Sequence, residues 1–77
     1  MDLRDELQAL ARRELGLTAG LPDGELAASL DSLQRLALVV AIEDHFRIQF
    51  EPEDEETVHT VDDVIRVIER KRHAPRD

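Results

Sequence analysis

Apolar residues recur along the chain at the spacing of amphipathic helices, and no stretch alternates in the manner of a β-strand. Leu3, Leu7 and Leu10 stand at positions i, i+4 and i+7, which places them on one face of a helix over about residues 2–15. Gly16 follows the last periodic residue, where a glycine commonly ends a helix. The pattern therefore predicts a first helix with one buried stripe.

Residues 16–30 predict a long connection, because glycine and proline interrupt them at Gly20, Pro22 and Gly24. Leucines nevertheless recur within this segment. We therefore expect the connection to lie against the helices through Leu17, Leu21, Leu26 and Leu30.

The second predicted helix, over about residues 32–47, contains the most apolar run of the chain. Asp31 suits its N-cap, and Gln34 can complete a capping box. Every residue from Leu36 to Ile42 is apolar. Such a run predicts a central helix that is buried on several sides, with Val40 in the core.

Two further helices follow. Pro52 suits the first turn of a short helix over about residues 53–57, with Phe50 and Val58 turned inward. Thr60 and Asp63 form a helix-start signature for a last helix over about residues 61–72, and residues 73–77 are expected to fray. Its buried face is predicted from the spacing of Val61, Val64, Ile65 and Ile68.

These elements predict an all-α fold with residues 1–77 in a single domain. We expect a small antiparallel four-helix bundle with three longer helices, one short third helix and a long first loop. The chain has no cysteine, so its core must close by helix packing alone. Neither a membrane-spanning run nor a signal peptide is evident, and we expect a cytoplasmic protein without membrane contact.

The net charge of −8 is unevenly distributed. Residues 43–63 contain nine acidic side chains against one arginine, whereas basic residues predominate from Val64 onward. An acidic protein of this kind is poorly suited to bind nucleic acid through phosphate contacts. It suits basic protein surfaces instead, because opposite charges steer encounter.

Ser32 is the first residue of the most apolar predicted helix. The unpaired backbone N–H groups and the macrodipole at a helix N-terminus favour negative charge. A phosphodiester attached to Ser32 would therefore be tolerated, with apolar side chains directly below it.

The motif Asp31-Ser32-Leu33, the apolar helix ending in residues 42–46 and the acidic segment 51–56 together resemble the acyl carrier protein family. The resemblance spans about residues 3–71. It implies that Ser32, flanked by Asp31 and Leu33, carries 4′-phosphopantetheine derived from coenzyme A, whose thiol holds an acyl group as a thioester. It also implies an acyl pocket between the helices, formed at the matching positions by Leu36, Val40, Phe46, Phe50, Val58 and Ile65.

The resemblance further implies a monomeric, non-catalytic carrier that shuttles acyl intermediates between enzymes of fatty-acid, polyketide or related secondary-metabolite biosynthesis. Its partners would be a phosphopantetheinyl transferase and acyl-loading and acyl-transferring enzymes with basic docking surfaces. The family commonly has an acidic residue after the motif, where this chain has Gln34 and Arg35. We therefore expect an altered choice of partners, through docking residues Arg35, Glu43, Asp44, Glu53 and Glu56.

Other functions fit the sequence less well. Residues 51–56 lack the spaced ligands of a calcium loop, and His45, His59 and His73 stand too far apart for a local metal motif. Ser32 lacks the glycine-flanked elbow of a hydrolase. The remaining alternatives are an aminoacyl, peptidyl or D-alanyl carrier and an unmodified acidic helical module that acts through protein contacts.

Overall fold

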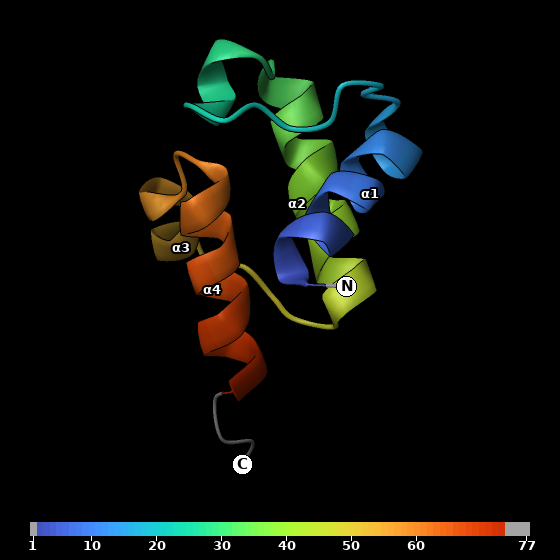
Figure 1. Cartoon of the computed structure of the whole chain (residues 1–77). Coiled ribbons are helices and arrows are strands. Elements are labelled where there is room, and N and C mark those ends of the chain that lie inside the picture. The colour runs from blue at the N-terminus through green and yellow to red at the C-terminus, as the bar shows by residue number, and fades with distance from the viewer. Residues whose placement is uncertain (1, 74–77) are drawn as a thin grey trace.

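The computed structural model describes residues 2–73, and all of its regular structure in that range is helical. Figure 1 shows α1 running opposite to α2 and α4, whereas α2 and α4 run in the same direction. The short α3 packs against α4. A small helical bundle with a short third helix and a long first loop is therefore confirmed, and the antiparallel relation holds for α1 against the other two long helices. The elements are α1 (Leu3–Leu15), a 3₁₀ turn η1 (Leu26–Ala28), α2 (Ser32–Phe46), α3 (Pro52–Thr57) and α4 (Val61–His73).

Local sequence signals set most helix ends. The Asp2 carboxylate accepts the N–H of Asp5 at 2.9 Å to begin α1, and Gly16 ends it in the left-handed region at φ +69°. Arg47 ends α2 with φ +58°, an uncommon conformation for a residue with a side chain. Each long or short helix differs from its expected bounds by one residue: α1 begins one residue later, α2 ends one earlier, α3 begins one earlier and α4 extends one further, to His73. Fraying was expected over residues 73–77; His73 belongs to α4, and residues 74–77 lie outside the described residues.

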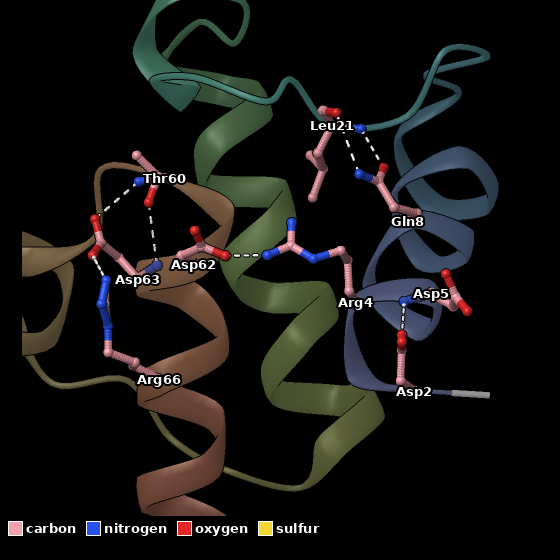
Figure 2. Close-up of polar contacts among 9 residues, drawn as sticks. All are labelled: Asp2, Arg4, Asp5, Gln8, Leu21, Thr60, Asp62, Asp63 and Arg66. Atoms are coloured by element: carbon pink, nitrogen blue, oxygen red, sulfur yellow. Dashed lines mark hydrogen bonds and ion pairs between the residues drawn. The ribbon is translucent and has the colours of Figure 1, made fainter.

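α4 begins at the reciprocal cap that the sequence predicts (Figure 2). The Thr60 hydroxyl accepts the N–H of Asp63 at 3.3 Å, and the Asp63 carboxylate accepts the N–H groups of His59 and Thr60 at 3.0 and 3.1 Å. These backbone hydrogen bonds, from His59 first, outweigh partial desolvation and hold the pKa of Asp63 below its ordinary value of 3.8. Arg66 adds an exposed ion pair to Asp63 at 3.0 Å, and Arg4 of α1 pairs with Asp62.

The first connection is attached to the helices, as expected. The side-chain amide of Gln8 in α1 makes two hydrogen bonds to the backbone of Leu21 in this connection (Figure 2). Gln8 Oε1 accepts the Leu21 N–H at 2.6 Å, and Gln8 Nε2 donates to the Leu21 carbonyl at 3.3 Å. Gly20 makes this approach possible, since a Cβ there would lie 2.3 Å from Gln8 Oε1 and its φ is +78°. Near η1, the Leu26 N–H donates to the His59 carbonyl at 2.7 Å.

One apolar core joins the three long helices, the connection and Phe50. Predicted core positions Leu7, Leu10, Val64 and Ile68 are buried, while Ile65 is half-buried. Val67, which the sequence analysis did not single out, is buried as well. The complete set of buried apolar side chains is Leu7, Leu10, Ala11, Leu21, Leu26, Leu30, Leu38, Ile42, Phe50, Val61, Val64, Val67 and Ile68.

α2 differs from the prediction that it is buried on several sides. Only Leu38 and Ile42 of this helix are buried, whereas Leu33, Leu36 and Val40 are 77%, 58% and 54% exposed. The placement of Val40 in the core is therefore wrong. The reason is that α3 is six residues long and packs on α4, so it leaves the outward side of α2 uncovered. The apolar run thus belongs to two different faces of one helix.

Asp54 differs from the other acidic residues of segment 51–56, which are exposed. It lies in α3 with only 5% of its surface exposed, and it forms ion pairs with Arg70 and Lys71 of α4. Phe50 is buried and Val58 is half-buried against the core, so both turn inward as predicted. Within residues 2–73, no helix has the length and apolar character that crossing a bilayer requires.

Candidate functional site

Ser32 is exposed at the first position of α2, and a capping box holds the backbone around it. The Asp31 carboxylate accepts the Gln34 N–H at 2.8 Å, and Gln34 Oε1 accepts the Asp31 N–H at 3.1 Å. The first N–H groups of a helix have no carbonyl partner within the helix. Together with the macrodipole, these donors make the surroundings of Ser32 favourable for a phosphate.

A cavity of about 280 Å³ opens beside Ser32, between α2 and the segment that contains α3. Its polar lining residues Ser32, Arg35 and Glu55 are all exposed, so they stand at its opening. The rest of the wall is apolar and is formed by Leu26, Leu36, Leu38, Val39, Ile42, Phe50, Val58 and Val64. The serine hydroxyl is therefore next to a space that suits an apolar chain.

The structure brings half of the predicted pocket residues to this cavity. Leu36, Phe50 and Val58 line it. Val40 points outward instead, Ile65 packs against the core, and the Phe46 ring lies edge-on to the His45 ring at 4.8 Å and beneath the Arg72 guanidinium at 5.7 Å. These positions lie outside the cavity because Val40 is on the outer side of α2 and Phe46 is at its far end.

Six residues that line the cavity were not among the predicted site residues: Leu26, Leu38, Val39, Ile42, Glu55 and Val64. Val39 and Leu26 illustrate two different reasons. Val39 lies on the same side of the helix as Ser32 and Leu36, seven residues after the first and three after the second, so helical spacing alone could have identified it. Leu26 reaches the cavity only because η1 folds back to the loop before α4. No local pattern around Leu26 indicates that contact.

An exposed apolar stripe adjoins the opening, and we refer to Leu33, Leu36 and Val40 as the outer face of α2. Their spacing of three and four residues aligns them along one side of the helix. They are the most exposed large apolar residues of the described chain. Clustered exposure of this kind marks a binding surface more often than scattered single residues do.

The predicted docking residues fall into two groups. Arg35, Asp44, Glu53 and Glu56 are exposed and can meet a partner. Glu43 is half-buried, and its carboxylate accepts the Phe50 N–H at 2.7 Å, which ties α2 to the loop before α3. Glu43 therefore has a structural role that the sequence analysis missed, because its partner is a backbone group in a loop.

The described residues contain no group of three histidine, cysteine, aspartate or glutamate side chains that could hold a metal ion. His45 lies 3.5 Å from Glu6 of α1, in a contact that joins two helices. The exposed serine, the donors of the first helical turn and the adjacent cavity instead fit a covalent arm that carries a phosphate and an apolar load.

Comparison with known proteins agrees with this geometry. Residues 5–68 match the model of a family described as phosphopantetheine attachment site. The acyl carrier protein of Helicobacter pylori (strain J99 / ATCC 700824) is 32% identical over 78 residues, covering 96% of this chain and 100% of that protein. The chain therefore belongs to the acyl carrier protein family of phosphopantetheine-binding domains, whose prosthetic group is covalently bound 4′-phosphopantetheine.

Proposed function

We propose that Ser32 is the attachment residue and that the chain is a non-catalytic carrier. It holds acyl intermediates as thioesters and passes them between enzymes of fatty-acid, polyketide or related secondary-metabolite biosynthesis. The observation that carries this proposal is the position of Ser32, exposed at the start of α2 and at the opening of an apolar cavity. The other serine, Ser29, borders a separate hollow between the first connection and α1.

Each part of the site has a physical task in this proposal. When bound, 4′-phosphopantetheine supplies the thiol that holds the acyl group. The N–H groups at the start of α2 stabilise the phosphate, and Asp31 keeps that helix end in place by capping it. The walls formed by Leu36, Val39 and Val58 offer cover to an apolar chain, since burying apolar surface is favourable.

Partner enzymes must approach Ser32, and the outer face of α2 lies directly beside it. Its exposed leucines and valine supply apolar contact area, while Asp44, Glu53 and Glu56 suit basic docking surfaces. Arg35 is an exposed cation at the cavity opening and would repel a partner that places a lysine or arginine there. We therefore propose that Arg35 restricts which enzymes can use this carrier.

The attachment site is tested by incubating the purified protein with coenzyme A, magnesium and a broad-specificity phosphopantetheinyl transferase. Intact mass should rise by one phosphopantetheine in the wild type and in the control Ser29→Ala, and should not change in Ser32→Ala. A modified Ser32→Ala protein, or an arm on Ser29, would show that Ser32 is not the site. An unmodified wild type would instead favour a module that acts through protein contacts alone.

A further inference from the structure

α3 depends on one of its own side chains for attachment to the rest of the molecule. Of its six residues, Asp54 is buried and the other five are exposed. A helix this short is not stable by itself in water, because too few hydrogen bonds offset the cost of ordering it. The flanking residues Phe50 and Val58 pack against the apolar core. The position of α3 thus depends on what Asp54 contacts.

Asp54 is held by two cations and one backbone donor. Lys71 Nζ lies 2.8 Å from Asp54 Oδ2, Arg70 pairs with Oδ1, and both cations belong to α4. The Glu51 N–H donates to Oδ2 at 2.9 Å and closes the start of α3. Burial would raise the pKa of Asp54, but the hydrogen bonds and charges around it prevail and hold that pKa below 3.8. The carboxylate is therefore charged and fully engaged at neutral pH.

The same segment forms one wall of the cavity beside Ser32. Phe50, Glu55 and Val58 come from α3 or the residues next to it, and they face Leu36 and Val39 of α2. α4, which supplies the cations for Asp54, contributes Val64 to the wall. The separation of the two walls must then follow the position of α3 relative to α4.

We propose that Asp54 is a positioning residue for the cavity: its ion pairs with Lys71 and Arg70 fix α3, and α3 fixes the width of the space beside Ser32. Loss of the carboxylate charge frees α3 and widens or collapses that space, while the packing of α1 on α2 persists. The inference rests on the proposed function only in taking this cavity to be the place where an acyl chain lies. Its tests need no bound arm.

Amide hydrogen exchange of the unmodified protein tests the attachment of α3 directly. In Asp54→Asn, the exchange rates of the amides of residues 54–58 should rise about tenfold more than those of the α1 amides. The reason is that local opening of α3 in the wild type must break the ion pairs of Asp54, whereas in the variant these pairs are absent and opening costs less free energy. Glu53→Gln is the matched control, since it removes a neighbouring exposed carboxylate of the same helix. Asp62→Asn is a second control: it removes a carboxylate charge on α4 and the ion pair of that carboxylate to Arg4, and it should leave the exchange of the α3 amides unchanged. Equal exchange of α3 in Asp54→Asn and Glu53→Gln would overturn the proposal.

The cavity is followed in the same variants with xenon, which enters apolar cavities. Xenon should shift the methyl resonances of Val39, Val58 and Val64 in the wild type and in Glu53→Gln, and these shifts should change about twofold or more in Asp54→Asn. Unchanged shifts would show that Asp54 does not set the cavity. If Asp54→Asn does not fold, Lys71→Gln removes one of the two cations while the sequence of α3 stays unchanged, and the same exchange and xenon measurements apply to it. A wild type that accepts no phosphopantetheine would refute the proposed function while leaving these results valid.

Discussion

The two sides of α2 contain the same kinds of side chain in opposite surroundings. Leu38 and Ile42 are 3% and 1% exposed. Leu36 precedes Leu38 by two residues and Val40 precedes Ile42 by two, yet these side chains are 58% and 54% exposed. The inner side faces α1 and the core, whereas the outer side is largely exposed in residues 2–73, with only Leu36 bordering the cavity. Folding thus buries the apolar side chains on only one side of α2. The outer face of α2 is therefore accessible to other molecules, because the fold does not use it for packing.

The largest expected loss of stability comes from a substitution on the inner side of α2. Ile42→Ala should lower the free energy of unfolding by about 2–5 kcal/mol, since it removes buried methyl groups and leaves a cavity. Val40→Ala on the outer side should change it by less than about 0.5 kcal/mol. Urea denaturation of both variants measures the contrast. Similar losses at the two positions would refute the division of α2 into two sides.

The next effect concerns pH and α3. Asp54 has a pKa below 3.8 in the folded protein, so its contribution to stability is complete above the ordinary pKa of aspartate and is lost as pH falls through the folded value. The wild type should therefore lose stability on acidification below about pH 4. Asp54→Asn should show a shallower dependence in that range, measured by thermal unfolding between pH 7 and pH 3. Parallel curves for the two proteins would show that Asp54 does not contribute in this way.

The start of α2 provides a smaller effect. Asp31→Ala should lower the free energy of unfolding by about 0.5–2 kcal/mol, because the Gln34 N–H loses its acceptor. Asp31→Asn keeps an acceptor oxygen and is the matched control, expected to retain most of the stability. Chemical denaturation distinguishes the two variants. A loss of equal size in both would mean that charge, rather than the hydrogen bond, stabilises this end.

These helix ends are the part of the fold that the sequence predicts well, because each depends on residues three or four positions apart. The pairs Asp31 with Gln34 and Thr60 with Asp63 cap their helices as expected. Which side of α2 is exposed, the burial of Asp54 and the hydrogen bond of Glu43 to Phe50 depend on contacts between distant segments. Half of the predicted pocket failed to reach the cavity for the same reason, since periodicity gives a helical face but not its neighbour.

The smallest expected effect concerns the choice of partner. Arg35→Glu should improve loading by a malonyl transferase of fatty-acid biosynthesis a few-fold, because an exposed charge pair is worth about 1 kcal/mol or less. Asp44→Lys should weaken loading, and it is a better probe than Glu43→Lys, which would also break the hydrogen bond to Phe50. Rates of malonyl transfer to the phosphopantetheine-bearing variants measure both effects. If Arg35→Glu loads no better than the wild type, Arg35 is an ordinary surface charge.

The most direct test of the contrast between the two sides uses Leu33, which is 77% exposed and follows Ser32. Two quantities are measured on Leu33→Ala: the free energy of unfolding, and kcat/KM for phosphopantetheine transfer to the proposed attachment residue, Ser32. Unfolding should match the wild type within about 0.5 kcal/mol, while kcat/KM falls about tenfold, the change that a loss of ~1.4 kcal/mol in the encounter with the transferase produces. A destabilised protein, or one that is modified at the wild-type rate, would contradict the view that the outer face of α2 serves partners rather than the fold.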